Sequence, residues 1–269
     1  MTTDVTTGAH RPGTGRLAGR RILVVGAGTR FSNAPAAPPG NGRAIAVVAA
    51  REGAAVACAD MNLRSAEDTA ALIHDEGGTA KVVVADVSEP NACEAMVGEA
   101  TELLGGLDGL VLNVGIGAGR WLKGTSAEDW HAVFDVNVRS HFLTCQAALP
   151  LMADRGSIVF ISSVAALVPG STIPAYDASK AALAGLGRHV AFEGARRGIR
   201  ANVVAPGLID TPLGRLASKG RPGRTDALVA LRRQGTAWEV AAPVVFLLSD
   251  EAGYITGQIL AVDGGLSTV

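Results

Sequence analysis

The sequence has little charge, few aromatic residues and no long hydrophobic run. Of its 269 residues, 18% are charged and 4% are aromatic, and the formal net charge is −1. This balance provides no long-range field to attract nucleic acid or a membrane surface. No apolar run approaches the roughly 18 residues of a membrane span, and the N-terminus lacks the apolar centre of a secretory signal peptide. We therefore expect neither nucleic-acid nor membrane partners.

Cysteine is also scarce, and its pattern excludes two classes of protein. The three cysteines are Cys58, Cys93 and Cys145. Their odd count and wide spacing within apolar segments match neither a disulfide framework nor a metal site. The histidines show no ligand spacing either, so we expect no metal. We expect reduced, buried cysteines in a cytoplasmic protein.

The length fits one compact domain that buries about three quarters of its unfolded surface. Hydrophobic residues make up 48% of the chain, and there are 34 glycines, which suits close packing of helices on a sheet. The polar, glycine-containing N-terminus predicts a mobile tail over residues 1–18. Residues 19–269 are then expected to form a single domain.

The segment 156–212 carries the strongest chemical pattern. It reads as an apolar strand, a loop with Ser163, a helix opening at Tyr176, and a second apolar strand that ends at Pro206 and Gly207. Tyr176 and Lys180 are four residues apart and so share one helix face. A phenol has a pKa of about 10, which a nearby ammonium lowers, so the pair can move a proton. Tyr-x-x-x-Lys alone is a weak signal, because both residues are common in helices.

With its surroundings, this segment resembles the short-chain dehydrogenase/reductase family in its single-domain form. The resemblance rests on Ser163, thirteen residues before Tyr176, and on the helix sequence around Lys180, AYDASKAA. It implies that Tyr176 is the general acid or base and that Lys180 lowers the tyrosine pKa and binds the nicotinamide ribose. Ser163 would orient the substrate oxygen. Asn137 would hold a water that continues the proton relay, although a buried core asparagine is the alternative.

The glycine-rich turn before the first helix departs from the family pattern. A strand over residues 21–25 leads into Gly26, and a helix follows Gly40 and Gly42. Glycines at a strand-to-helix turn let the backbone approach a dinucleotide pyrophosphate, and the helix N-terminus favours the negative charge. The family pattern is G-x-x-x-G-x-G, whereas about ten extra residues within 29–39 separate Gly26 from Gly40 here.

This insertion in the glycine-rich loop leaves three interpretations open. In the first, the inserted residues, which include Pro35, loop outward while Gly26, Gly40 and Gly42 keep their places. In the second, the loop folds over the cofactor and slows its exchange, or forms part of the substrate mouth. In the third, Gly28 replaces one of the three glycines and the pocket is remodelled.

Asp60 favours NAD over NADP. It ends the second expected strand, about 20 positions beyond the glycine turn once the insertion is discounted. A carboxylate there accepts hydrogen bonds from the adenosine ribose and repels a 2′-phosphate. Alternatively, Asp60 caps the helix that starts near Ser65, and Arg30, Arg43 or Arg64 meets a phosphate.

The remaining cofactor contacts follow from the resemblance alone. It assigns contacts with the adenine, the ribose and the nicotinamide to Asp86, Val87, Asn113, Gly115, Pro206, Gly207, Ile209 and Thr211, together with Tyr176 and Lys180. Asn113 and Gly115 would serve equally to shape the turn after the fourth strand.

Two further segments bear on the substrate and on assembly. The helix from Tyr176 to about Arg196 is apolar around much of its circumference, which is typical of burial on two sides and agrees with the homotetramers common in the family. The glycine- and arginine-rich segment 213–235 is expected to cover the substrate. Its basic residues either receive an acidic or acyl-carrier substrate or form a solvated face: Arg215, Lys219, Arg221, Arg224, Arg232 and Arg233.

Together these patterns predict an α/β protein with a Rossmann-like, doubly wound, mainly parallel sheet of about seven strands and helices on both faces. The expected function is hydride transfer between NAD(H) and a secondary alcohol or ketone. The alternatives are a catalytically weak nucleotide-binding sensor or assembly subunit, and a dehydratase or epimerase that uses NAD transiently. The sequence does not name the substrate.

Overall fold

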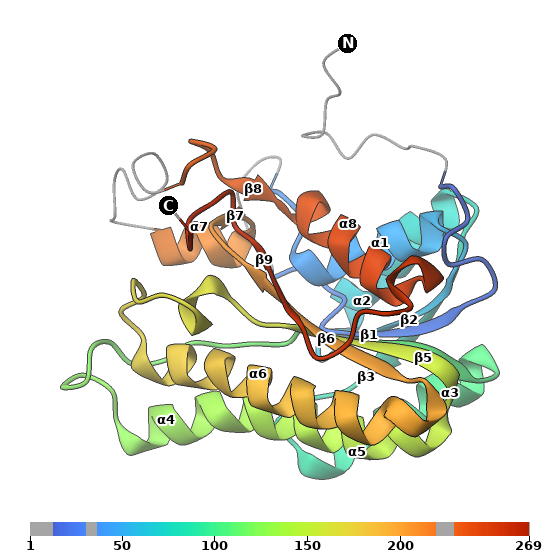
Figure 1. Cartoon of the computed structure of the whole chain (residues 1–269), viewed down its shortest axis with the longest axis horizontal. Helices are drawn as coiled ribbons and strands as arrows, with labels where there is room; N and C mark the ends of the chain where they lie inside the picture. Colours follow the sequence, from blue (N-terminus) through green and yellow to red (C-terminus); the bar gives the residue numbers. More distant parts are fainter. Residues whose placement is uncertain (1–12, 31–36, 219–228, 269) are drawn as a thin grey trace.

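A seven-stranded parallel sheet forms the centre of the molecule (Figure 1). The computed structural model describes residues 13–30, 37–218 and 229–268. The strand order is β3-β2-β1-β4-β5-β6-β9, and every pair in this sheet is parallel. The strands are β1 (Arg21–Val25), β2 (Ala55–Asp60), β3 (Thr79–Val84), β4 (Leu107–Leu112), β5 (Met152–Ile161), β6 (Arg200–Pro206) and β9 (Ile259–Val262). The predicted α/β class and doubly wound sheet are confirmed.

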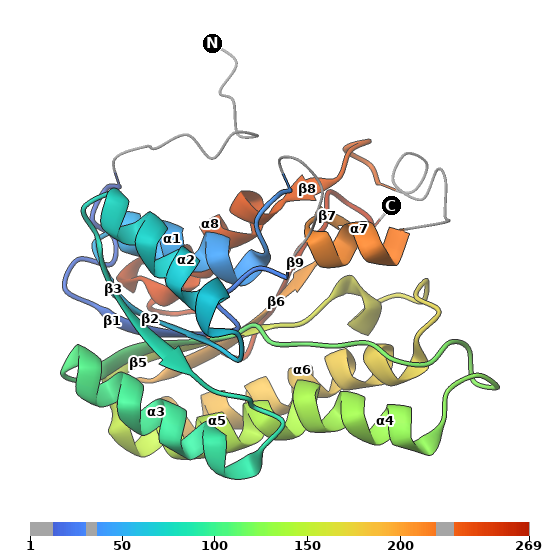
Figure 2. The ribbon, with the colours of Figure 1, turned by 180° about the vertical axis from the view of Figure 1, so that it is seen from behind.

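Helices cover both faces of this sheet, as Figures 1 and 2 show from opposite sides. One face carries α1 (Asn41–Arg51), α2 (Leu63–Asp75) and α8 (Ala237–Leu248), and the other carries α3 (Pro90–Leu104), α5 (Ser140–Leu151) and α6 (Pro174–Gly194). Successive strand residues point to opposite faces, so Val24 enters the first core and Leu23 the second. Both side chains are fully buried. Burial on both faces explains why the strands read as unbroken apolar runs.

The order of the strands fixes where a ligand can bind. From β1 the chain proceeds outward through β2 and β3, and then returns to the other side of β1 at β4. In a doubly wound sheet, the crevice at the carboxyl ends of the strands on either side of this reversal is the ligand site. Gly26, Asp60, Asn113, Ser163 and Gly207 each end a strand or follow within two residues of its end.

The chain before β1 is partly packed against the domain. Residues 1–12 of the expected tail lie outside the described residues. Within residues 13–18, Leu17 is fully buried and its N–H donates to the carbonyl oxygen of Glu52 at 2.9 Å. Arg16 pairs with the Glu52 carboxylate at 2.8 Å. The packed part of the chain therefore begins before the predicted boundary at residue 19.

Several elements differ from the sequence-based expectation. The helix expected from Tyr176 begins two residues earlier, with Pro174 in its first turn, where a missing N–H has no effect. Asn137 lies in a π-helical turn, η1 (Asp135–Arg139), that joins α4 (Ala127–Phe134) to α5. A small parallel sheet of β7 (Ile209–Asp210) and β8 (Gly235–Thr236) was not predicted.

The expected substrate cover is described only at its two ends. Its first part forms α7 (Pro212–Ser218), and the described chain resumes at Val229. Lys219, Arg221 and Arg224 lie outside the described residues. No helix in the described ranges is long and apolar enough to cross a membrane.

Candidate active site

Tyr176 and Lys180 lie one turn apart near the start of α6, as predicted. Lys180 is almost fully buried, with 3% of its surface exposed. Its Nζ lies 5.7 Å from the centre of the Tyr176 ring and donates to the carbonyl oxygen of Ile161, the last residue of β5, at 3.0 Å. The lysine therefore connects α6 to the carboxyl end of the central sheet.

Burial dominates the acid–base properties of this pair. It lowers the pKa of the Lys180 ammonium to about 8. Burial also raises the pKa of the Tyr176 phenol; hydrogen bonding by the Ser163 side chain lowers that pKa, and the charge of Asp177 raises it. The net direction is upward, so the expectation of a phenol pKa lowered by the lysine is wrong for the protein alone. Loss of hydration at the phenolate outweighs the hydrogen bond from Ser163.

A neutral histidine lies in the same buried region. His141 is 1% exposed, and burial, followed by the positive charge of Lys180, lowers the pKa of its imidazole to about 3. At neutral pH it adds no second positive charge beside the lysine. Among the described residues, no group of three or more His, Cys, Asp or Glu side chains could hold a metal ion.

The end of β5 positions the serine of the predicted set. Ser163 follows the strand, and its Oγ accepts a hydrogen bond from the N–H of Ala165 at 3.2 Å, which starts the short helix η2 (Val164–Ala166). The preceding Ser162 donates from its buried Oγ to the carbonyl oxygen of Lys180 at 2.8 Å. The strand end and the catalytic helix are therefore joined directly, with Ser163 beside the phenol.

Asn137 is fully buried, and its carboxamide is fully engaged. Oδ1 accepts from the N–H of Ile116 at 2.8 Å, while Nδ2 donates to the carbonyl oxygen of Ile116 at 2.9 Å and to Oγ of Ser179 at 2.9 Å. Both N–H groups of the amide are used. The side chain therefore ties the loop after β4 to α6, and the proposed relay water would need another group of Asn137, such as its backbone carbonyl.

The glycine turn after β1 is tight, as is required for the backbone to come close to a pyrophosphate. Gly26 has φ +78°, in the region that side chains disfavour. A Cβ on Gly42 would lie 1.8 Å from the carbonyl oxygen of Gly26. That same oxygen accepts a hydrogen bond from Nδ2 of Asn113 at 2.9 Å. No larger residue fits at Gly42, and Asn113 fixes the turn to the end of β4.

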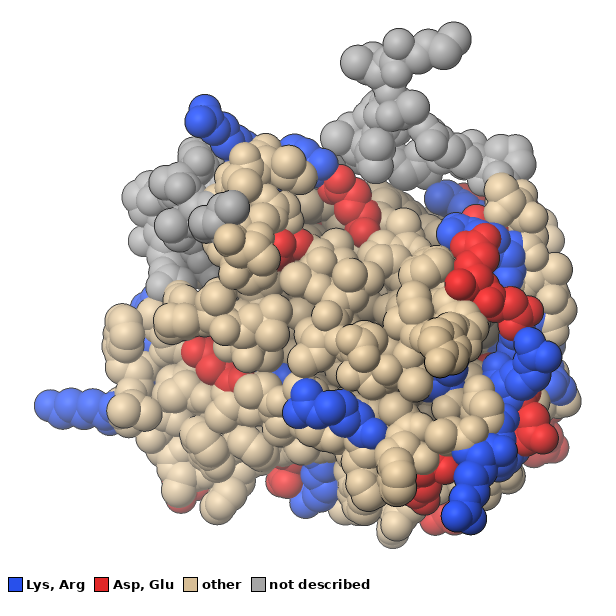
Figure 3. All heavy atoms as spheres, in the orientation of Figure 1, with Lys and Arg blue, Asp and Glu red and all other residues tan. Residues whose placement is uncertain are grey.

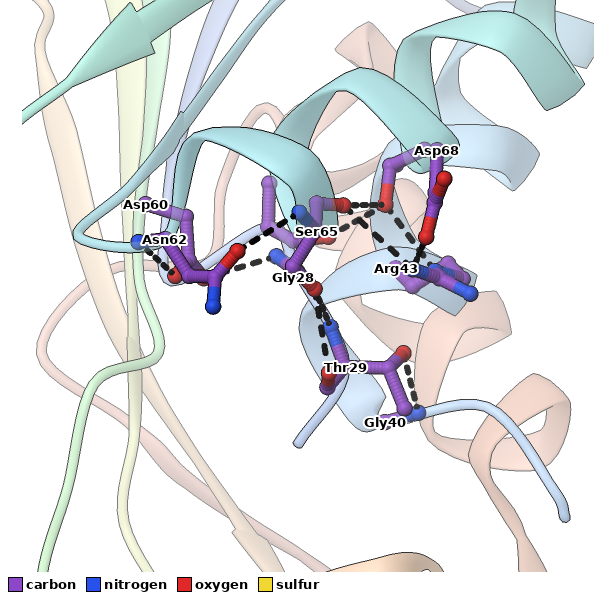
Figure 4. A network of polar contacts seen from close by, with 10 residues as sticks. Gly28, Thr29, Gly40, Arg43, Asp60, Asn62, Ser65 and Asp68 are labelled. Carbon is purple, nitrogen blue, oxygen red and sulfur yellow. Dashed lines mark hydrogen bonds and ion pairs between the residues drawn. The ribbon is translucent and has the colours of Figure 1, made fainter. Parts of the chain in front are cut away.

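The inserted segment leaves this turn and returns to it at adjacent points (Figure 4). The N–H of Gly40 donates to Oγ1 of Thr29 at 3.0 Å. Ser65 at the start of α2 accepts from the N–H of Thr29 at 2.7 Å and donates to its carbonyl oxygen at 3.0 Å. This geometry corresponds to the first interpretation, in which Gly26, Gly40 and Gly42 keep their places. Residues 31–36, including Pro35, lie outside the described residues.

Asp60 lies at the carboxyl end of β2 and contacts the same turn. One carboxylate oxygen accepts from the N–H of Gly28 at 2.9 Å, and the other accepts from the N–H of Asn62 at 3.0 Å. Asn62, not Asp60, caps α2 by accepting from the N–H of Ser65, so the alternative role of Asp60 as the cap is wrong. A carboxylate has about four acceptor positions, which leaves Asp60 capacity for ribose hydroxyls.

Arg43, one of the three arginines considered as partners for a 2′-phosphate, is directed toward α2 (Figure 4). Its Nε donates to Oγ1 of Thr69 at 3.0 Å, and an Nη donates to the carbonyl oxygen of Ser65 at 3.3 Å. Asp68 lies 3.8 Å away. These contacts hold the guanidinium against the helix.

The other predicted cofactor residues line the same edge of the sheet. A Cβ on Gly115 would lie 2.8 Å from Nζ of Lys180, so a larger residue there would displace the ammonium. Asp86 accepts from the N–H and Oγ of Ser88, and Val87 is buried among the core residues beneath.

The far side of the edge is formed by the residues after β6. The N–H of Gly207 donates to the carbonyl oxygen of Val262 at 3.0 Å, after Pro206 ends the strand. Ile209 and Thr211 are each 7% exposed, and Oγ1 of Thr211 accepts from the N–H of Gly214 at 3.0 Å. The structure thus brings all of the predicted positions to one edge of the sheet.

Three residues of this region were missed by the sequence analysis. Thr29 and Ser65 form hydrogen bonds at the neck of the insertion, the point where its two ends, Thr29 and Gly40, meet. Ser179 contacts Asn137. The signal for Ser179 was its place directly before Lys180 on the helix that carries the tyrosine. Thr29 and Ser65 are 36 residues apart, and no short-range pattern links them.

Comparisons with known proteins find related enzymes along almost the whole chain. A family model described as enoyl-(acyl carrier protein) reductase matches residues 36–267. The chain is 38% identical over 262 residues to 2-(S)-hydroxypropyl-CoM dehydrogenase 3 of Xanthobacter autotrophicus, covering 94% of this chain and 99% of that protein. It is 34% identical to a 3beta-hydroxysteroid dehydrogenase of Mediterraneibacter gnavus, covering 94% and 97%.

A solved structure gives the same result in three dimensions. The short-chain dehydrogenase/reductase from Serratia marcescens superposes with a TM-score of 0.85 at 33% sequence identity. The superposition covers 94% of this chain and the whole of that chain. The likeness therefore extends across the described fold and includes the strand ends that carry the site.

Proposed function

The chain belongs to the short-chain dehydrogenase/reductase family of oxidoreductases, and we propose that it is an NAD-dependent secondary-alcohol dehydrogenase or ketone reductase. The observation that carries this proposal is the convergence of Tyr176, Ser163 and Lys180 at the carboxyl edge of the sheet, beside Gly115. A binding module has no need of this acid–base set. When bound, the nicotinamide cofactor supplies or accepts the hydride.

Tyr176 moves the proton. In reduction its phenol donates a proton to the substrate carbonyl oxygen, and in oxidation the phenolate removes the alcohol proton. Ser163, which lowers the pKa of the phenol by hydrogen bonding, donates to the same substrate oxygen and fixes its position. Such a positioned pair stabilises the negative charge that develops on the oxygen.

Lys180 supports the tyrosine and binds the cofactor. Its Nζ uses one N–H for the carbonyl oxygen of Ile161 and has two more donors, which suit the hydroxyls of the nicotinamide ribose. Gly115 leaves only backbone next to this ammonium, because a Cβ there would lie 2.8 Å from Nζ. A ribose can therefore approach the lysine at this point of the strand edge.

We propose NAD as the cofactor, with NADP less favoured. Asp60 presents a carboxylate next to the glycine turn, where it would accept from ribose hydroxyls and repel a 2′-phosphate. Arg43 is held against α2 by Thr69 and the backbone of Ser65. These two contacts support the proposal, since they keep one candidate phosphate partner, Arg43, engaged with α2.

The substrate is proposed to be a small-molecule secondary alcohol or ketone. The relatives are named for 2-(S)-hydroxypropyl-CoM and for a 3beta-hydroxysteroid, both of which carry a hydroxyl group. The turn after β5 and the residues after β6 contribute mainly apolar side chains near the site, including Leu167, Leu213 and Leu216, which are 42%, 43% and 53% exposed. Apolar walls favour an alicyclic or acyl body over a sugar.

We further propose a cytoplasmic homotetramer. Phe192 on α6 is 82% exposed and Phe142 on α5 is 47% exposed, and large exposed apolar side chains mark association surfaces. Figure 3 shows few charged residues where α6, β9 and α8 meet the surface. The three cysteines are free and buried, as in a reducing compartment.

The test is a fluorescence titration of nucleotide-free protein with NADH and with NADPH, followed by an NAD-linked panel of secondary alcohols. Tight NADH binding with much weaker NADPH binding is expected. Asp60→Ala should reduce the difference in affinity between NADH and NADPH, whereas Asp68→Asn should leave that difference unchanged. Tyr176→Phe should abolish turnover and leave NADH affinity within about threefold. Cofactor binding without turnover on any substrate would instead favour a nucleotide-binding sensor, and turnover without a net absorbance change would favour a dehydratase or epimerase.

A further inference from the structure

We propose that Ser179 is a positioning residue, which sets the catalytic tyrosine against the loop that follows β4. This proposal rests on the proposed function, because its main readout is turnover. Ser179 directly precedes Lys180 and is fully buried. Its hydroxyl links two parts of the chain that otherwise approach one another only through side-chain packing, namely the π-helical turn η1 and the first turn of α6.

The hydroxyl of Ser179 both accepts and donates a hydrogen bond. Oγ accepts from Nδ2 of Asn137 at 2.9 Å and donates to the carbonyl oxygen of Tyr176 at 2.8 Å. Asn137 in turn holds both the N–H and the carbonyl oxygen of Ile116. A continuous chain of hydrogen bonds therefore runs from the backbone of the strand-end loop to the backbone of the catalytic tyrosine.

This chain ends where the loop touches the reacting groups. A Cβ on Gly117 would lie 3.8 Å from Cδ2 of Tyr176, and one on Gly115 would lie 2.8 Å from Nζ of Lys180. Ile116, which the chain holds, lies between these two glycines. A small displacement of Ile116 would therefore move the backbone that packs on the phenol and on the ammonium together.

Removal of the Ser179 hydroxyl would break this chain of hydrogen bonds and leave the fold in place. Alanine is the best helix former, so Ser179→Ala does not weaken α6 locally. It does leave one N–H of Asn137 without its acceptor in a buried site, which is unfavourable. The carboxamide can then shift, and its hold on Ile116 loosens. Because small errors in the geometry of reacting groups reduce rates strongly, we expect kcat to fall about tenfold with little change in the cofactor KM.

Ser157→Ala is the matched control. Ser157 is also a fully buried serine, and its Oγ donates to a helix carbonyl, that of Leu247, at 2.8 Å. That helix is α8, on the opposite face of the sheet from α6. Both substitutions should lower the thermal midpoint by a similar amount, whereas only Ser179→Ala should lower kcat.

Two further measurements separate positioning from a general loss of stability. Hydrogen exchange at the Ile116 amide, which donates to Asn137, should become faster in Ser179→Ala and stay unchanged in Ser157→Ala. In an Asn137→Ala background, Ser179→Ala should cause little further loss of kcat, because the two side chains act as one unit. If Ser179→Ala does not fold, Ser179→Cys, which keeps a weak donor, is measured in the same way.

Wild-type turnover on the alcohol panel is established first, so that the two proposals fail separately. Absence of wild-type turnover would overturn the proposed function. With an active wild type, an unchanged kcat in Ser179→Ala would overturn the positioning role. An equal loss of kcat in Ser157→Ala, or full additivity with Asn137→Ala, would overturn it as well.

Discussion

Thr29 and Gly40 are eleven residues apart in the sequence, yet Oγ1 of Thr29 accepts a hydrogen bond from the N–H of Gly40 at 3.0 Å. An ideal Cβ on Gly40 would lie 3.6 Å from Cα of Thr29. The two ends of the insertion, Thr29 and Gly40, therefore lie in direct contact. Ser65 holds the Thr29 side of this neck to α2.

Deletion of residues 30–39 should therefore preserve the fold and cofactor binding. Joining Thr29 to Gly40 gives the sequence GAGTGNG, which has the uninterrupted spacing G-x-x-x-G-x-G, and it needs little movement of α1. We expect a thermal midpoint within about 4 °C of the wild type and an NADH Kd within about threefold. Thermal unfolding and reduced-nicotinamide fluorescence measure the two quantities.

The same variant tests whether the inserted residues serve the cofactor. If they hinder its exchange, the deletion should raise the NADH dissociation rate in stopped-flow measurements while the fold stays intact. Thr29→Ala, which removes the neck hydrogen bond and keeps the insertion, is the control. Loss of NADH binding by a well-folded deletion variant would contradict the interpretation in which Gly26, Gly40 and Gly42 keep their places.

Lys180→Met should stabilise the protein at neutral pH while removing its activity. Burial lowers the pKa of Lys180 from 10.5 to about 8, a difference of about 2.5 units at 1.36 kcal/mol each. Because the folded state binds its proton less tightly, this burial penalty is fully present below pH 8 and disappears as the pH rises to 10.5. Methionine avoids the penalty but loses the bond to Ile161, so we expect a net gain of about 2 kcal/mol in the free energy of unfolding at pH 7.

Urea unfolding of both proteins at pH 7 and at pH 10.5 measures this effect. The gain should be clear at the lower pH and small at the higher pH. Lys81→Met, at an exposed position of β3, is the control and should show no such dependence on pH. A Lys180→Met variant that is less stable than the wild type at pH 7 would mean that the ammonium is stabilised where it lies.

The protein has two tyrosines, which makes the catalytic phenol directly observable. In a Tyr254→Phe background, ultraviolet absorbance follows the ionisation of Tyr176 alone, and Tyr254 is itself fully exposed. Burial is the largest influence on this phenol and raises its pKa above the ordinary 10.0. We therefore expect the midpoint above pH 10 in the cofactor-free protein.

Ser163→Ala should raise that midpoint further, because the Ser163 side chain lowers the phenol pKa. Ser171→Ala removes a hydroxyl that bonds only to the backbone near Ile173 and serves as the control. A midpoint that falls in Ser163→Ala would contradict the hydrogen bond to the phenol. For alcohol oxidation, kcat/KM should rise with pH, since it reports the free enzyme.

The strands and the edge that carries the site were predictable for a physical reason. Parallel strands are buried on both faces, so runs such as Ile22–Val25 are apolar throughout and easy to recognise. The carboxyl ends of these strands lie along one edge of the sheet, which is why Asp60, Asn113 and Ser163 could be expected at that edge. The prediction that Lys180 lies beside Tyr176 needed only the helical repeat, and Nζ of Lys180 lies 5.7 Å from the centre of the Tyr176 ring.

Other features depend on three-dimensional contacts that leave no local pattern. The hydrogen bonds between Thr29 and Ser65 join the loop after β1 to a helix far along the chain. The π-helical turn at Asn137 has no compositional signature, although such turns often occur at functional sites. The direction of the Tyr176 pKa is set by desolvation, which the spacing of Tyr176 and Lys180 does not reveal.

Glu52 should make the protein sensitive to acid. Its carboxylate is 7% exposed and accepts from the N–H and Oγ of Thr14 and from the N–H and an Nη of Arg16 at 2.8 to 3.2 Å. Burial alone would raise the pKa of this carboxyl, but the bonds from Arg16 and Thr14 outweigh it and lower the pKa from 4.5 to about 2. The difference of about 2.5 units corresponds to at most about 3 kcal/mol of stability.

This stabilisation should be fully present above pH 4.5 and lost as the pH falls toward 2, because the folded pKa lies below the unfolded one. Glu52→Gln should therefore reduce the free energy of unfolding by about 2 kcal/mol at pH 7, and the two proteins should converge as the pH approaches 2. Denaturant unfolding between pH 2 and pH 7 measures the gap, and Glu94→Gln, at an exposed position of α3, is the control. A constant gap across this range would assign the loss to packing, whereas convergence would show that the charged carboxylate holds residues 14–16 against the domain.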